Sequence, residues 1–151
     1  MTEHLFHLTA RWPGERNAVG DINAGNLQTN VSIPKEMDGP GIGTNPDEML
    51  LGAAATCYMI TLAALLERAN IQTNTQTLQS VGTVDVTNGV FTYKKIVHKP
   101  TIVLMPNATP AQIERANRFA IKAEETCMIS KALRGNVQLE VEATIQVAPV
   151  I

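Results

Sequence analysis

The feature that most constrains the fold is a run from Met49 to Leu66 that contains no charged residue. Asn45, Pro46 and Glu48 stand just before it as N-cap, first helical residue and capping-box acid, so we expect a helix that begins at Pro46. The run is just long enough to span a bilayer. Small residues at positions 52–57 lower its hydropathy and give it a flat surface, which favours a central helix buried on all sides in a soluble core.

Two strands are expected before this helix. Residues 3–12 and 27–33 alternate loosely between apolar and polar side chains, and Pro13-Gly14 and Gly25-Asn26 mark turns between them. The segment 36–43 is rich in glycine and is expected to be a loop.

A hairpin is expected after the helix. Segments 75–87 and 90–105 are rich in Val, Ile, Thr and Tyr, and they flank Asn88-Gly89, the strongest short-range hairpin signal. Pro100 lies inside the second segment, so that strand is either split there or lies at an edge.

The C-terminal third predicts two helices and a strand. Thr109 to Gln112 form a second capping motif. A shorter helix, 127–133, ends before Gly135, and residues 137–147 alternate as a last strand. The apolar face of the longer helix comprises Ile113, Ala116, Phe119, Ala120 and Ala123. This order of elements predicts an α+β fold in a single domain over residues 1–151.

Composition excludes some classes of binding partner and favours others. The net charge of -2 and the aromatic content of 4% leave neither a basic surface for phosphates nor a stacking surface for bases, so no nucleic acid is expected. Charged residues make up 17%, against roughly 25% in ordinary soluble domains, which favours a surface covered by another subunit. The N-terminus carries no secretory signal, so we expect a cytoplasmic protein that binds no membrane.

The two cysteines, Cys57 and Cys127, are the candidate reactive groups. Taken alone, Cys57 in an apolar helix is most often a small buried side chain. Thr126 is placed to cap the helix after Cys127, whose dipole would lower the pKa of that thiol; a buried thiol is the alternative. Ser130 and Lys131 are expected on the helix surface, although an amine near the thiol is the alternative. Whether the cysteines meet depends on the fold, because a disulfide needs Cα atoms within about 7 Å.

Metal and cofactor motifs are not found. His4, His7 and His98 form no ligand spacing with the cysteines, so no metal site is expected. The sequence has no phosphate loop, dinucleotide fingerprint or serine-hydrolase motif, so no cofactor is expected either.

Two segments centred on the cysteines resemble the OsmC/Ohr family of osmotically inducible and organic hydroperoxide resistance proteins. They are Asn45 to Leu50 followed by Cys57, and Cys127 to Asn136. The resemblance covers essentially the whole chain. The segment Val31 to Pro34, with the glycine-rich run after it, is closer to the organic hydroperoxide resistance branch.

The resemblance implies a fold and an activity. The fold is α+β and OsmC-like, with antiparallel sheets wrapped around long central helices in an intertwined homodimer and with sites at the subunit interface. The activity is that of a thiol peroxidase for organic hydroperoxides, in which Cys57 becomes a sulfenic acid and Cys127 resolves it to a disulfide. The reductant that the resemblance suggests is a lipoyl-type dithiol.

The resemblance also implies an arginine and a carboxylate beside the reactive thiol. Arg16 occupies the arginine position, with Arg11 as the alternative, and Asp47 occupies the carboxylate position, where the family has Glu. Glu48 is the substitute partner for Arg16. A second departure is Met128, which stands where a proline usually follows the second cysteine.

One arginine serves both the thiol and a carboxylate only if the central helix is not straight. Asp47 and Cys57 are ten residues apart, which is about 15 Å along a straight helix. We therefore expect the helix to bend or break, and Gly52, the poorest helix former in the segment, is the expected place. A straight helix with both carboxylates far from Arg16 and Cys57 would favour the alternatives to a peroxidase.

Two alternatives to an active peroxidase are a redox-sensing or lipid-like ligand-binding protein on the same fold, and a protein whose cysteines are inert core. Apolar side chains near Cys57 suit either an alkyl hydroperoxide or a core, because both bury hydrocarbon. They are Met49, Leu50, Met59 and Ile60.

Overall fold

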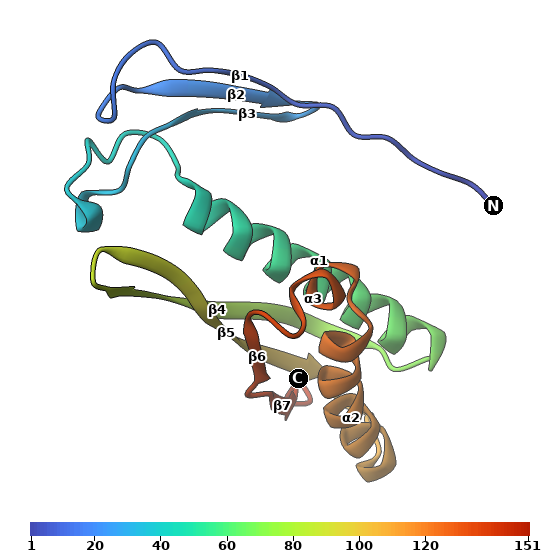
Figure 1. Ribbon diagram of the computed structural model, residues 1–151. Helices are drawn as coiled ribbons and strands as arrows, with labels where there is room; N and C mark the ends of the chain where they lie inside the picture. Colours follow the sequence, from blue (N-terminus) through green and yellow to red (C-terminus); the bar gives the residue numbers. More distant parts are fainter. The chain divides into compact units, whose positions relative to one another are not determined.

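The computed structural model describes residues 1–151, and its internal contacts divide into two units, Met1–Met49 and Leu50–Ile151. The first unit holds an antiparallel three-stranded sheet in the order β1-β2-β3 (Figure 1). A 3-10 turn, η1, follows the sheet. The bounds are β1 Thr9–Arg11, β2 Gly20–Ala24, β3 Leu27–Val31 and η1 Lys35–Met37.

The middle strand of this sheet was not predicted from the sequence. Gly25 and Asn26 form a two-residue turn, with Gly25 at φ 61°, and Ala24 pairs with Leu27 across it. A Gly-Asn pair is a hairpin signal, and it indicates a strand on each side. The segment 20–24 is short and polar and shows little hydrophobic alternation, so the pattern does not predict the first of these strands.

The predicted helix start is confirmed. α1 spans Pro46–Arg68, and the backbone N–H of Glu48 donates to Asn45 Oδ1 at 2.9 Å. The carboxylate of Glu48 accepts from the hydroxyl of Thr44 at 2.8 Å. The Asn45 side chain accepts from one of the first-turn N–H groups that have no partner within the helix. Proline at the first helical position has no N–H, so no donor is left unpaired there.

The expectation that this helix is buried on all sides is wrong for the single chain. Its buried residues recur every four positions and form one face, and they are Ala54, Tyr58, Leu62 and Leu66. Ile60 points away from that face and is 66% exposed. By length and composition α1 is apolar enough to cross a membrane, and only 22% of its most apolar window is buried within the chain. The sheet and the helices that follow it pack against this one face and leave the other side of α1 uncovered.

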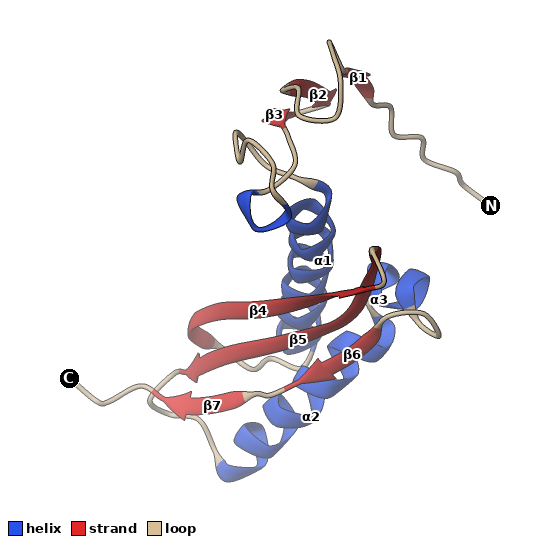
Figure 2. Cartoon of the chain, turned by 60° about the vertical axis from the view of Figure 1, so that its left-hand side comes forward, coloured by secondary structure: helices blue, strands red, loops and turns tan.

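The second unit is built on a mixed sheet in which β5 is central (Figure 2). β4 and β5 form the predicted hairpin, and Asn88 and Gly89 have φ of 51° and 74°, as a tight turn of this kind requires. The bounds are β4 Thr73–Thr87, β5 Val90–Leu104, β6 Gln138–Val141 and β7 Thr144–Val147.

The last predicted strand is divided into two, and both parts run parallel to β5. β6 pairs with residues 95–98 of β5, and β7 pairs with residues 101–104. Pro100 lies between these two stretches, where β5 has no ladder partner on that side. The strand therefore continues through Pro100 without a split, because the missing N–H falls at a local gap in the sheet.

Two helices follow the hairpin, α2 (Pro110–Thr126) and α3 (Met128–Leu133). The predicted capping box of α2 is complete: Gln112 N–H donates to Thr109 Oγ1, and Thr109 N–H donates to Gln112 Oε1. α1 and α2 share the main core with the sheet, which places both on one face of it (Figure 2). This core includes Tyr58, Leu62, Leu66, Ile102, Leu104, Ala116, Ala120 and Ala123.

Candidate active site

The structure brings Cys57 and Cys127 together as free thiols within hydrogen-bonding range. Cys57 lies in the middle of α1 and is partly exposed. Cys127 is the residue between α2 and α3 and is fully buried. The two cysteines therefore meet within the second unit, which the sequence alone does not show.

Hydrogen-bond donors around Cys57 favour its thiolate. Burial alone raises the pKa of Cys57, but donated hydrogen bonds outweigh it, so the pKa lies below the ordinary value. The donors are the Cys127 thiol, the backbone N–H groups of Ile129 and Met128, and the hydroxyl of Thr61. Thr61 also donates to the carbonyl oxygen of Cys57 at 2.8 Å.

The pKa of Cys127 is shifted in the opposite direction. Burial raises its pKa, and its hydrogen bond to Cys57 raises it further, while the backbone N–H and hydroxyl of Ser130 act in the other direction. The expectation of an acidic Cys127 is therefore wrong, and the alternative, a buried thiol, is confirmed. Thr126 does not cap α3: it is the last residue of α2, and its hydroxyl donates to the Lys122 carbonyl oxygen at 2.8 Å. Cys127 itself holds the N-cap position of α3.

One buried and one exposed polar contact join the elements that carry the thiols. The hydroxyl of Tyr58, next to Cys57, donates to the carbonyl oxygen of Ala120 in α2 at 2.7 Å. Arg134, just after α3, pairs with Glu124 near the end of α2 at 2.8 Å. These contacts fix the spacing of α1, α2 and α3 around the thiol pair.

Ser130 is a site residue that the sequence places wrongly. Its exposure is 0%, although a surface position was expected, whereas Lys131 is exposed as expected. A serine in a short helix carries no burial signal of its own, since only the packing of α3 decides which of its faces turns inward. The other predicted alternative, an amine beside the thiol, has no supporting contact in the structure.

Arg16, Asp47 and Glu48 belong to the first unit. The guanidinium of Arg16 donates to Asn17 Oδ1 at 2.9 Å and to the Met37 carbonyl oxygen at 3.0 Å. Asp47 and Glu48 lie in the first turn of α1. The alternative arginine, Arg11, forms an ion pair with Asp21 at 2.9 Å.

The expected break at Gly52 is wrong, because α1 is unbroken from Pro46 to Arg68. The carbonyl oxygen of Gly52 accepts a hydrogen bond from the hydroxyl of Thr56 at 2.7 Å, and a Cβ at Gly52 would meet no atom within 4 Å beyond its own turns of the helix. One glycine in a long helix costs only about 1 kcal/mol, which the other residues of α1 outweigh. Asp47 and Cys57 are therefore separated by about 15 Å of continuous helix.

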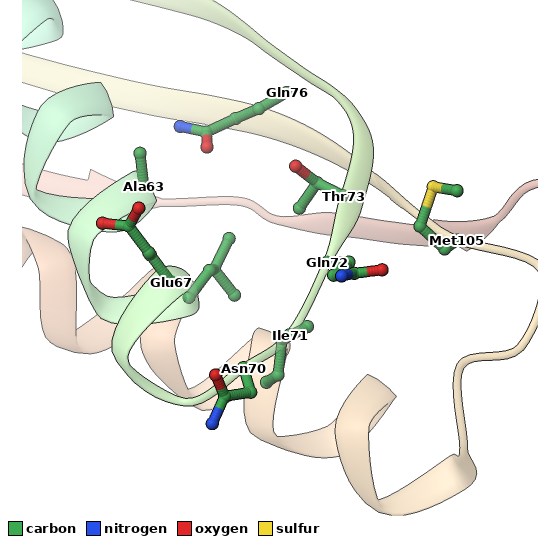
Figure 3. Close-up of a pocket in the computed structure, with 9 residues that line it drawn as sticks. Ala63, Glu67, Asn70, Ile71, Gln72, Thr73, Gln76 and Met105 are labelled. Carbon is green, nitrogen blue, oxygen red and sulfur yellow. The ribbon is translucent and has the colours of Figure 1, made fainter.

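A separate cavity of about 530 Å³ opens at the C-terminal end of α1 (Figure 3). Figure 3 shows Glu67 and Gln76 on its wall, with Met105 at one end. Glu67 is its one charged lining residue, and neither cysteine contributes to it. No three His, Cys, Asp or Glu side chains are grouped to hold a metal ion.

Comparison with known proteins identifies the family. Residues 39–142 match the family described as OsmC-like protein. The chain is 57% identical to the uncharacterized protein YmaD of Bacillus subtilis over 97% of both chains. It is 26% identical to the organic hydroperoxide resistance protein OhrB of the same organism, over 89% of this chain and 96% of OhrB.

Solved structures agree on the fold. The crystal structure of an organic hydroperoxide resistance protein OsmC from Legionella pneumophila superposes with a TM-score of 0.74 at 22% identity, over 94% of this chain and 99% of that one. The crystal structure of Bacillus subtilis OhrB superposes with a TM-score of 0.67 at 25% identity, over 93% and 98%. The chain belongs to the OsmC-like family, and its α+β fold is that of the family.

Proposed function

We propose that this chain is a thiol peroxidase that reduces organic hydroperoxides. The observation that carries the proposal is that a partly exposed thiol, Cys57, lies within hydrogen-bonding range of a fully buried one, Cys127. The hydrogen-bond donors around Cys57 also lower its pKa, which favours the thiolate that a nucleophile must be. Membership of a family that includes organic hydroperoxide resistance proteins supports the same activity.

The proposed reaction has two steps on the protein. The Cys57 thiolate attacks the terminal oxygen of the hydroperoxide, the O–O bond breaks, and the alkoxide leaves and takes up a proton to become an alcohol. Cys127 then attacks the sulfur of the Cys57 sulfenic acid, and a disulfide and water form. A dithiol, for which a lipoyl-type group is our proposal, returns both cysteines to thiols.

A homodimer is proposed to complete the site. The unbroken α1 keeps Asp47 about 15 Å along the helix axis from Cys57. Arg16 and the carboxylates belong to one unit and the thiols to the other. We propose that Arg16 of the partner subunit, held by Asp47 or Glu48, polarises the peroxide at Cys57.

The exposed side of α1 supports the same dimer. Ala53, Thr56, Ile60 and Ala63 are exposed in the single chain, although they belong to a helix with a mean hydropathy of 2.0 over its most apolar window. Covering such a face with a second copy removes apolar surface from water.

We also propose that the protein is located in the cytoplasm.

The second candidate is a redox sensor on the same fold, and the unbroken α1 is the observation that favours it. Without an arginine beside the thiol, Cys57 is oxidised slowly and once, and turnover is not supported. The apolar side chains near Cys57 then hold a lipid-like ligand instead of a hydroperoxide.

Steady-state consumption of cumene hydroperoxide with a dithiol reductant tests the proposal. An enzyme consumes many equivalents and cycles between dithiol and disulfide. A sensor consumes one equivalent and stays oxidised, which overturns the proposal in favour of the second candidate. Inert thiols consume none, and the intact mass of the protein is then unchanged.

A further inference from the structure

Ser130 is the buried polar side chain near the thiols that the proposed reaction leaves unused. It lies in α3, its exposure is 0%, and its hydroxyl has no hydrogen bond of regular geometry in the reduced protein. Buried hydroxyl groups are nearly always hydrogen-bonded, since an unpaired one costs the free energy of its lost hydration. The reduced state therefore contains a donor that lacks a good acceptor.

The sulfur of Cys127 is the acceptor that the geometry offers. Cys127 is the N-cap of α3 and Ser130 stands three residues later, the spacing at which the N-cap side chain and the third helical residue face each other. The N–H and the hydroxyl of Ser130 both lower the pKa of Cys127, although neither makes a hydrogen bond of regular geometry with its sulfur in the reduced protein. A neutral thiol is a weak acceptor, whereas a thiolate is a strong one, so the hydroxyl gains a full partner only when Cys127 loses its proton.

We propose that the Ser130 hydroxyl is the hydrogen-bond donor that activates Cys127 for disulfide closure. This inference rests on the proposed function. As Cys127 loses its proton, Ser130 Oγ donates to the developing thiolate, which attacks Sγ of the Cys57 sulfenic acid. The S–S bond forms, the S–O bond of the sulfenic acid breaks, and the departing hydroxide takes the proton to become water. No outside oxidant or reductant enters this step.

A single-turnover experiment tests the inference with Ser130→Ala and, as control, Lys131→Ala on the exposed side of the same helix. Each reduced protein receives one equivalent of cumene hydroperoxide, and sulfenic acid and disulfide are followed by quenching and intact mass. We expect Ser130→Ala to form the sulfenic acid at the wild-type rate and to close the disulfide about tenfold more slowly at neutral pH. The difference should shrink as pH rises, because alkali then supplies the thiolate.

Two outcomes of this experiment would overturn the inference. One is unchanged closure in Ser130→Ala. The other is closure slowed by the same factor at every pH, which indicates that Ser130 only packs α3. Lys131→Ala should close its disulfide like the wild type.

A titration separates failure of this inference from failure of the proposed function. In a Cys57→Ala background, the thiolate absorbance of Cys127 is followed against pH with and without Ser130→Ala. We expect Ser130→Ala to raise the pKa of Cys127, and equal titration curves would overturn the inference. This readout needs no peroxide, so a protein that consumes none but shows the shift would refute the peroxidase, while the hydrogen bond from Ser130 to the Cys127 thiolate would still be demonstrated.

Discussion

The ring of Tyr58 stacks on the ring of His98, with centroids 4.6 Å apart and planes 18° from parallel. His98 is fully buried in β5, and its Nδ1 shares a hydrogen bond of 2.7 Å with the hydroxyl of Ser80. Its Nε2 has no partner. A titratable side chain is therefore buried against Tyr58, the residue after Cys57, and nothing is placed to accept a second ring proton.

This arrangement predicts that stability falls in mild acid. Burial lowers the pKa of His98 below its ordinary 6.5, so below that pH the unfolded chain binds a proton that the folded chain resists. Stability should be full above about pH 6.5 and should fall by up to about 1.4 kcal/mol per pH unit below it. Urea unfolding at several pH values measures this slope.

His98→Phe keeps a ring on Tyr58 and removes the titration, so the slope due to His98 should vanish even though the variant is less stable. His4→Gln changes an exposed histidine and serves as control. A slope that persists in His98→Phe would refute the assignment.

The cysteine variants should separate the two chemical steps. We expect Cys57→Ser to abolish peroxide consumption, because it removes the thiol with the lowered pKa. Cys127→Ser should still form a sulfenic acid at Cys57 but close no disulfide. Trapping with a sulfenate-specific reagent and peptide mapping check this, and preferential labelling of Cys127 in the wild type would reverse the two roles.

Met128→Pro should raise the pKa of Cys57. Met128 is the first residue of α3, and its backbone N–H favours the Cys57 thiolate, whereas proline has no N–H to donate. Cys127 has φ −61° and ψ 129°, a conformation that a following proline tolerates, so the fold should persist. We expect the pKa of Cys57 to increase, measured by thiolate absorbance.

Met128→Ala is the matched control for this substitution. It removes the side chain, which is 71% exposed, and keeps the N–H. The pKa of Cys57 should stay at the wild-type value in this variant. Equal titration of the proline and alanine variants would show that the backbone donor has no influence.

The sequence predicts well those features that are encoded locally. The start of α1, the capping box of α2 and the Asn88-Gly89 hairpin each depend on a few adjacent residues, and each is confirmed. The thiol pair is suggested by resemblance, but only packing brings α1 and α3 together. The short strand β2 and the division of residues 137–147 into two strands depend on partners distant in sequence, which alternation alone does not reveal.

Two predictions made from the sequence at this site are wrong for the same physical reason. Ser130 and Cys127 were placed from the local properties of a short helix, yet the burial of both is decided by what α3 packs against. Burial then reverses the expected effect on the pKa of Cys127, since desolvation of a thiolate outweighs the first-turn donors. Tertiary packing thus governs the chemistry that separates the two cysteines.

Ile60→Glu should dissociate the proposed homodimer. Ile60 lies in the apolar helix α1 and is 66% exposed in the single chain. A buried carboxylate at an interface without a partner is strongly disfavoured. Ile121→Glu, at a position of α2 that is 50% exposed, is the control and should leave the assembly unchanged. Sedimentation velocity checks this, and a wild-type protein that is monomeric at micromolar concentration would refute the dimer.

Mixed dimers test whether Arg16 acts on the thiol of the other subunit. Arg16→Ala and Cys57→Ser are each expected to be inactive as homodimers. If the arginine acts across the interface, a heterodimer of the two variants has one complete site, formed by Cys57 of the Arg16→Ala chain and the intact Arg16 of the Cys57→Ser chain. If it acts within one chain, the heterodimer has no complete site.

The proposed interface site leads us to expect recovery of activity in that mixture. Each heterodimer should show about half of the wild-type activity per dimer, since one of its two sites is complete. Separately tagged chains, co-expressed and purified on both tags, give a defined heterodimer for the peroxide assay. A doubly tagged wild-type dimer sets the full rate, and a heterodimer as inactive as its parents would place Arg16 outside a shared site.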